Sequence, residues 1–348
     1  MLGVMSRPSH RLLLYWAAGL LLVLGAAHSS NGYATDWVRA GQTTNSPVWG
    51  IENGLKFALH PGGFTGGDGS PRGLIRLGYP TLTNGGYDLI NFIAVEPIVR
   101  GKKGFSELEK SAVDQKNGKV FWTGTAGKPA IVTPHFDAGT LTTNAAGVTV
   151  LSLTVFVERF DNGAHVRLKL AQHSDAPDEW RLTVEAAPDS SPIESCILTA
   201  TMGNKARTRL LHLKDGPISS LKLFPDYRDK HFAPHSLFPL EKLPRATNGD
   251  LLIAITTDEP EPGLARPFGQ PGFWDYLGRP VTQYWRKPAA ELRPGLTCAV
   301  NARFTYWMSD RPIPGGIAFE NFELREPFQS GQTFIFGITR RSPLALVP

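Results

Sequence analysis

The chain has 348 residues, with 36 Lys plus Arg, 31 Asp plus Glu and a formal net charge of +5 at pH 7. This mild basicity suits an acidic partner without requiring one. Because no block of Lys and Arg is interleaved with aromatic residues, the composition excludes a dedicated nucleic-acid surface.

Residues 1–34 are predicted to be an export signal. Arg7 and Arg11 precede the 16-residue apolar run 12–27, and small residues stand before Thr35, the expected first residue after cleavage. A retained membrane anchor is the alternative, but 16 residues are short for a bilayer. We therefore expect a secreted or periplasmic protein that is not bound to a membrane after cleavage. Loss of the two arginines lowers the formal charge from +5 to +3.

The elements predicted after Thr35 are mainly β-strands. In the segment 164–173, Val166, Leu168 and Leu170 share one face, and polar residues share the other. Further segments with strand character are 148–160, 180–186, 196–202 and 297–307. This period of two predicts sheets rather than helices.

Two short helical stretches are expected among these strands. Ser106 and Glu109 form a capping-box pattern, and residues 288–292 are the second candidate. A dozen or more short strands, separated by Gly and Pro, predict an all-β fold. We expect one antiparallel two-sheet β-sandwich of the jelly-roll or supersandwich type, with long loops, over 35–348.

The long loops at 60–73 and 224–248 carry no recognised cofactor signature. The first is glycine-rich but lacks the spacings that bind nucleotides. The second contains four metal-ligand residue types, but Pro234 prevents one helix from presenting both histidines. These four residues are Asp226, Asp229, His231 and His235. A polar surface loop is the favoured interpretation, and neither a metal nor a cofactor is expected.

Cys196 and Cys298 are the only two cysteines. An exported pair can form a disulfide. Each also lies in phase with apolar neighbours on its strand, as a separate buried thiol would. The sequence leaves both possibilities open.

Two glutamates are the main catalytic candidates. Glu96 in "FIAVEP" and Glu320 in "GIAFEN" both follow Ile-Ala and one large apolar residue, in segments with strand character. A buried carboxylate needs a partner or a role. Glycoside hydrolysis uses two carboxyl groups, and Glu323 is the substitute if Glu320 is structural. The alternative is that each glutamate pairs with an arginine such as Arg72, Arg76 or Arg100.

Aromatic and basic residues further along the chain suggest contact with a saccharide. Trp274, Tyr276, Tyr284 and Trp285 lie within twelve positions, and aromatic faces stack on sugar rings. Candidates for binding an acidic sugar substituent are Asn204, Arg207, Arg209 and His212. An ordinary aromatic core would account for the tryptophans and tyrosines equally simply.

The segments "GGYDLINFIAVEPIV", "FSELEKS" and "GQTFIFGI" resemble a group of exported bacterial proteins found among polysaccharide degraders. The resemblance implies export and work on carbohydrate, and it carries no catalytic residues.

The leading hypothesis is an exported enzyme that cleaves a polysaccharide or oligosaccharide, as a glycoside hydrolase using Glu96 and Glu320, with substrate contacts from Trp274, Tyr284, Trp285, Arg207 and His212. The first alternative is a polysaccharide lyase that uses Tyr284 or His212 as its base, with Asn204 or Arg207 neutralising a uronate. The second is a saccharide-binding or envelope protein without catalysis.

Overall fold

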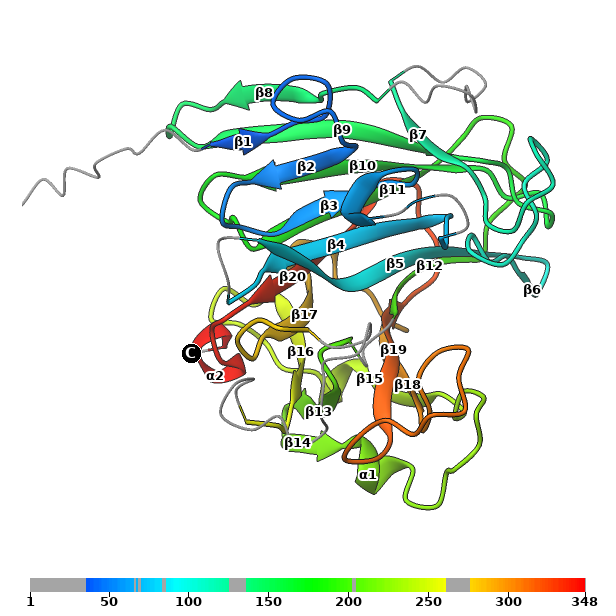
Figure 1. Ribbon diagram of the computed structural model, residues 1–348, viewed down its shortest axis with the longest axis vertical. Helices are drawn as coiled ribbons and strands as arrows, with labels where there is room; N and C mark the ends of the chain where they lie inside the picture. Colours follow the sequence, from blue (N-terminus) through cyan, green and yellow to red (C-terminus); the bar gives the residue numbers. More distant parts are fainter. Residues whose placement is uncertain are drawn as a thin grey trace, which may run out of the picture. The chain divides into compact units, whose positions relative to one another are not determined.

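A computed structural model describes residues 36–65, 67, 70–82, 86–124, 136–201, 205–260 and 276–347. Two large antiparallel sheets pack face to face (Figure 1), which confirms the predicted β-sandwich. Thr35 to Pro348 form one compact unit. The predicted export signal and its cleavage position lie outside the described residues. Within the described ranges no helix is long and apolar enough to span a membrane.

The first sheet is formed by the first strands of the chain together with four strands from its middle and later parts. Its strand order is β1 (Trp37–Val38), β2 (Val48–Ile51), β3 (Lys56–Ala58), β4 (Leu74–Pro80), β5 (Tyr87–Val99), β12 (Ser195–Thr201), β19 (Ala318–Arg325), β18 (Thr297–Arg303) and β15 (Ser236–Pro239). The short strand β6 (Lys102–Lys103) folds back on β5. The long strand β5 therefore lies near the centre of this sheet, between β4 and β12.

The second sheet has the order β14 (Gly216–Ser219), β13 (Thr208–Leu213), β16 (Leu251–Thr257), β17 (Thr282–Lys287), β20 (Gln332–Thr339), β11 (Glu179–Ala186), β10 (Val166–His173), β9 (Thr149–Val157) and β7 (Phe121–Thr123). Strand β8 (Thr140–Thr143) pairs with β9. The remaining elements are one-turn helices: η1 (Gly63–Thr65), α1 (Ser220–Leu223), η3 (Leu240–Lys242), η4 (Ala289–Glu291) and α2 (Pro343–Leu346).

The core lies between the two sheets and is built by alternate residues of each strand. Val166, Leu168 and Leu170 are buried in it, as their period of two predicts. Trp285 is fully buried against Phe336, with ring centroids 4.7 Å apart. Burying a large apolar side chain contributes about 1.5–3 kcal/mol, so this layer supplies most of the driving force for folding.

The predicted helix at Ser106 is absent, and the segment forms a turn instead. The Ser106 hydroxyl donates to the Gly73 carbonyl over 2.6 Å and accepts from the Val95 amide over 2.9 Å. Ser106 thus pairs with the edge of β5 rather than capping a helix. The second expected helix is present only as the 3₁₀ turn η4.

Both cysteines are buried free thiols. Cys196 is on β12 and Cys298 is on β18, the two neighbours of β19. Two strand spacings separate them by about 9–10 Å, whereas the Cα atoms of a disulfide lie within about 7 Å. The structure therefore decides against the disulfide that the sequence left open.

Candidate functional site

Glu96 lies on the face of the first sheet that is turned away from the second sheet. Its neighbours Val95 and Ile93 point into the core, so the alternation of β5 places Glu96 on the other side. On β12, the adjacent strand, Thr199 lies on the same outer face, and it is directly opposite Glu323 of β19. The register of three strands thus brings two glutamates and a threonine together.

A single hydroxyl joins the two glutamates. Thr199 Oγ1 lies 2.6 Å from Glu96 Oε2 and 2.6 Å from Glu323 Oε2. The two carboxyl oxygens are therefore at most about 5.2 Å apart, twice the length of one bond. Because a hydroxyl carries one proton, it donates to only one of these oxygens at a time. The arrangement favours a second proton on one of the carboxyl groups.

Cations contact both carboxyl groups. Lys103 Nζ lies 2.6 Å from Glu96 Oε2, and Arg325 Nε donates to Glu323 Oε1 over 2.6 Å. His235 Nε2 is 3.6 Å from the same Glu323 oxygen. The side chains of Lys103, His235 and Arg325 are 25%, 28% and 29% exposed, whereas that of Glu323 is 0% exposed. These three partly exposed side chains therefore separate the buried pair Glu96 and Glu323 from solvent.

The environments of the two acids differ. Burial raises the pKa of Glu96, the positive charge of Lys103 counteracts this, and the negative charge of Glu323 raises it further. Glu323, in contrast, receives two guanidinium contacts from Arg325. Burial also lowers the pKa of His235, so its imidazole is neutral at pH 7. Burial and the charge of Glu323 thus favour a proton on Glu96.

Glu107 adds a third carboxyl group beside this pair. Burial, followed by the negative charge of Glu96, raises the pKa of Glu107 to about 7. Three acids, Glu96, Glu107 and Glu323, therefore face two permanent cations, Lys103 and Arg325. We call these five residues and Thr199 the carboxylate cluster.

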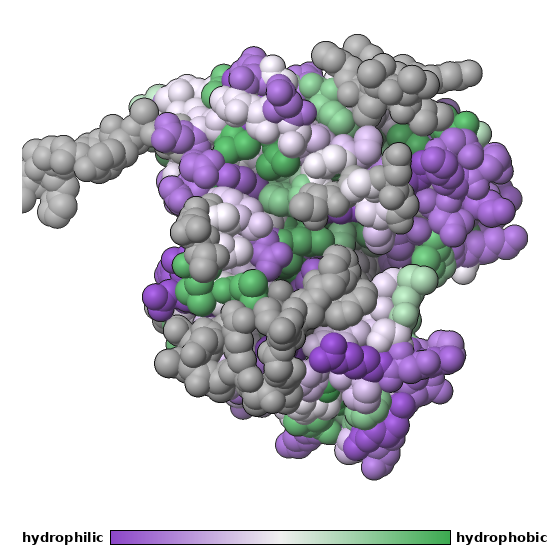
Figure 2. Space-filling model, in the orientation of Figure 1, coloured by the Kyte–Doolittle hydropathy of each residue, from purple (hydrophilic) through white to green (hydrophobic). Residues whose placement is uncertain are grey.

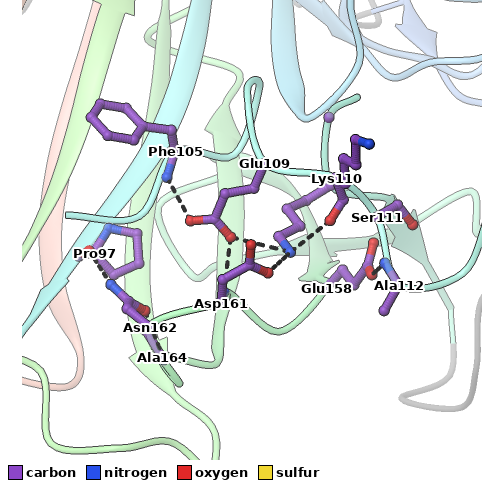
Figure 3. A network of polar contacts seen from close by, with 12 residues as sticks. Pro97, Phe105, Glu109, Lys110, Ser111, Ala112, Glu158, Asp161, Asn162 and Ala164 are labelled. Carbon is purple, nitrogen blue, oxygen red and sulfur yellow. Dashed lines mark hydrogen bonds and ion pairs between the residues drawn. The ribbon is translucent and has the colours of Figure 1, made fainter. Parts of the chain in front are cut away.

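A polar network holds the loop that supplies Lys103 and Glu107 (Figure 3). Lys119 is buried, and its Nζ lies 2.8 Å from Asp161 and 3.1 Å from Glu109. Asn162 donates to two carbonyl oxygens of the β5–β6 hairpin, each over 2.9 Å. Hydrophilic side chains gather on the side of the molecule where β6 lies (Figure 2). The loop that carries part of the cluster is therefore held in place by polar contacts, and hydrophilic residues lie around it.

Glu320 lies in a β-bulge rather than in the carboxylate cluster. Between the pairs Val300–Phe322 and Ala302–Phe319, β19 has one residue more than β18. Glu320 is 2% exposed and close enough to Arg303 to act on its pKa. Glu323, the substitute candidate, is the residue that shares a partner with Glu96.

Arg72 and Arg76, two of the three arginines proposed as structural partners of the glutamates, have other contacts. Arg72 pairs with Asp114, with Nη1 to Oδ2 at 2.7 Å, and Arg76 donates to the Ser70 hydroxyl over 3.0 Å. Arg303 instead lies over the rings of Phe232 and Trp307, at 5.0 and 4.9 Å from their centroids.

Of the proposed saccharide contacts that the structure describes, Tyr284, Trp285 and His212 lie on strands of the second sheet, and Arg207 directly precedes β13. Tyr284 is 3% exposed and its hydroxyl donates to Glu179 over 2.9 Å. Trp285 has no exposed surface, so in this structure it is a core residue. Arg207 pairs with Glu259 at 2.5 Å. Trp274 and Asn204 lie outside the described residues.

His212 has a different setting. Its Nε2 lies 2.9 Å from the Thr256 hydroxyl, and burial lowers its pKa. Ala254 is opposite both His212 and Tyr284, so the latter two lie in one row, two strands apart.

The polar loop at 224–248 does not gather metal ligands. His231 Nε2 is 3.9 Å from Asp229 Oδ1, and His235 points to Glu323 instead. Among the residues that the structure describes, no three His, Cys, Asp or Glu side chains form a group that could hold a metal ion.

Sequence reasoning missed Thr199, Lys103 and Arg325. A signal for Arg325 exists, because residues two apart in a strand share a face and Glu323 is two positions before it. Lys103 returns towards Glu96 through the β5–β6 hairpin, in which Ile98 is opposite Lys103. Thr199 is visible only once the register between β5, β12 and β19 is known.

No family model, no curated protein and no solved structure matches this chain. The resemblance to exported proteins of polysaccharide degraders therefore remains an expectation, and the function rests on the geometry of the site.

Proposed function

We propose that the protein is an exported glycoside hydrolase acting on a polysaccharide or oligosaccharide, with Glu96 as the acid and Glu323 as its partner carboxylate. The observation that carries this proposal is the shared contact with Thr199, which limits the separation of the two carboxyl oxygens to at most about 5.2 Å. Retaining glycosidases have carboxyl groups about 5–5.5 Å apart, and inverting enzymes about 6.5–9.5 Å. The limit for these two oxygens lies below the inverting range, so the proposal takes the retaining mechanism.

The roles follow from the two environments. Burial and the charge of Glu323 keep a proton on Glu96, which then protonates the oxygen of the leaving group. Arg325 donates to Glu323 over 2.6 Å and orients its carboxylate, which attacks the anomeric carbon and forms a glycosyl-enzyme intermediate. Glu96, now ionised, takes a proton from the water that releases the product. Access of substrate to the buried pair requires the partly exposed side chains of Lys103 and Arg325 to move aside.

Aromatic side chains close to β5 of the first sheet support a saccharide substrate. Phe232 is 40% exposed and lies next to Trp307, with ring centroids 5.9 Å apart. Trp307 packs on Phe92 and Ala94 of β5, the strand that carries Glu96. An exposed ring beside a guanidinium group suits a pyranose, which stacks through its C–H face and hydrogen-bonds through its hydroxyls.

The test compares Glu96→Gln, Glu323→Gln and Glu320→Gln on a panel of neutral and uronate-containing polysaccharides. Each of the first two changes should lower the release of reducing ends by about 10²–10⁴-fold, while Glu320→Gln retains most of the activity. NMR of the first product should show the anomeric configuration of the substrate.

Other outcomes would replace this proposal. Loss of activity in Glu320→Gln but not in Glu323→Gln would return Glu320 to the pair. An ultraviolet-absorbing product that persists in Glu96→Gln and Glu323→Gln would identify a lyase. Retention of polysaccharide in affinity gels without any cleavage would identify a binding protein.

A further inference from the structure

A groove lies on the outer face of the second sheet, whereas the carboxylate cluster lies on the first sheet. Its volume is about 780 Å³, within the range of about 300–1,000 Å³ that small-molecule sites occupy. The strands β13 and β16 form its floor, and β14, η3 with the residues after it, and α2 form its walls. We call it the β13–β16 groove; its lining residues include His212, Leu252, Ala254, Leu243, Pro217 and Leu344.

The floor of the groove is apolar and does not suit a sugar. Leu252 is 4% and Ala254 is 1% exposed, and both form a small apolar cluster with Leu346 and Val347 of the C-terminal segment. His212 is the polar group of the floor, and its imidazole is occupied by Thr256 and neutral at pH 7. A pyranose placed here would lose the hydration of its hydroxyls without gaining partners. An aliphatic chain has no hydroxyl groups whose hydration would be lost, and its burial is favourable.

The rim of the groove carries more positive than negative charge. Lys214 and Arg245 line it together with one acid, Glu241. The neighbouring Lys242 is paired with Asp215 at 2.9 Å, so it adds no net charge. The rim therefore complements an anionic head group, whereas the floor complements an aliphatic body.

We infer that the β13–β16 groove is a binding site for an amphipathic anion of the fatty-acid class, with the aliphatic chain on Leu252 and Ala254 and the carboxylate between Lys214 and Arg245. This site is independent of the proposed hydrolase activity, because the groove and the carboxylate cluster lie on different sheets.

Isothermal titration of the full mature chain with decanoate, octanoate and hexanoate tests the inference. Each buried methylene contributes about fourfold in affinity, so removal of two should weaken binding by about tenfold or more. The uncharged 1-octanol should bind more weakly than octanoate. No measurable binding of decanoate, equal affinity across the series, or equal affinity for octanol and octanoate would each overturn the inference.

Two variants locate the site. Leu344→Asp adds a negative charge to a wall residue that is 84% exposed, so it should weaken decanoate binding at least tenfold without affecting folding. The double charge reversal Lys214→Glu/Arg245→Glu should weaken octanoate but not octanol. Lys110→Glu, an exposed lysine in the loop beside the first sheet, is the matched control and should leave both affinities unchanged. Binding that is indifferent to Leu344→Asp and to the double variant would place it elsewhere and refute the inference.

Discussion

Buried carboxylates have different partners on the outer faces of the two sheets. On the second sheet, Glu179 receives the Tyr284 hydroxyl over 2.9 Å and two contacts from Arg286, which also pairs with Asp250 at 2.9 Å. Both oxygens of Glu179 accept hydrogen bonds, from the Tyr284 hydroxyl or from the Arg286 guanidinium group. The network therefore has the character of a structural ion pair.

On the first sheet the carboxylate cluster contains more acids than cations. Glu96 and Glu323 share one hydroxyl, and Glu107 adds a further acid that titrates near neutral pH. An excess of buried acid is resolved by binding protons. The comparison teaches that burial alone does not identify a reactive carboxylate. The better candidate is a carboxyl group in a cluster with fewer cations than acids, because one acid there keeps a proton that it can donate.

The largest expected difference between the two faces is in turnover. Glu323→Gln should lower the rate by about 10²–10⁴-fold, because the amide cannot act as nucleophile. Glu179→Gln is the matched change on the second sheet and should leave the rate per folded molecule within about twofold. Steady-state rates, normalised by circular dichroism to the folded fraction, measure both. Equal losses in the two variants would erase the distinction.

Removal of a cation from each kind of site should separate the faces by stability. Lys103→Met leaves Glu96 without its cation beside Glu323, and we expect a loss of about 2–3 kcal/mol at pH 8, where proton uptake by Glu96 compensates least for the lost cation. Lys169→Met is the control, since Lys169 is 54% exposed and pairs with Glu185 at the surface; it should cost less than about 1 kcal/mol. Urea unfolding measures both. A cost for Lys103→Met as small as the control would show that Glu96 needs no cation.

The pH dependence of stability should differ in sign between two acids. The pKa of Glu107 is raised from 4.5 to about 7, so the folded protein binds its proton more tightly than the unfolded chain. Its contribution is complete below pH 4.5 and is lost as the pH rises to about 7. Contacts with Lys169, then Arg167, lower the pKa of Glu185 on the second sheet despite its burial, so its contribution is lost as the pH falls below 4.5.

Urea unfolding between pH 4 and 8 tests this contrast. Glu107→Gln should remove a decrease on the order of 1–2 kcal/mol between pH 5 and 8, whereas Glu185→Gln should leave that interval unchanged. An unchanged slope in Glu107→Gln would mean that another group titrates there.

The smallest effect is expected for Tyr284→Phe. The change removes one hydrogen bond to Glu179, worth about 0.5–1.5 kcal/mol, and should leave the rate of the proposed glycosidase reaction intact. Thermal unfolding and the rate assay measure the two quantities. A loss of activity beyond tenfold with an intact fold would instead support Tyr284 as the base of a lyase.

The sequence was sufficient for the β-sandwich and for one of the two glutamates of the candidate site. Alternation of apolar and polar residues predicted the sheets, and a charge inside an apolar run singled out Glu96. The Ile-Ala-x-Glu echo selected Glu320, but the extra residue in β19 changes the phase of the strand, so Glu323 lies beside Thr199 instead. A bulge has no simple sequence signature, and the register between distant strands has none.

The aromatic pair shows the same limit. Adjacent residues of a strand point to opposite faces, so Tyr284 and Trp285 could not both contact one ligand. Which of them is buried in the core depends on the partner strand β20, where Phe336 lies against Trp285.

The separation of Cys196 and Cys298 by an intervening strand has a consequence for biosynthesis. Because the two thiols are buried and cannot reach each other, the native state requires no oxidant and no disulfide isomerase. Folding is therefore independent of the redox state of the compartment in which it takes place. Chain lacking residues 1–34 should reach the same native state in a reducing compartment as in an oxidising one, which makes production in a reducing cytosol a practical route to every variant above.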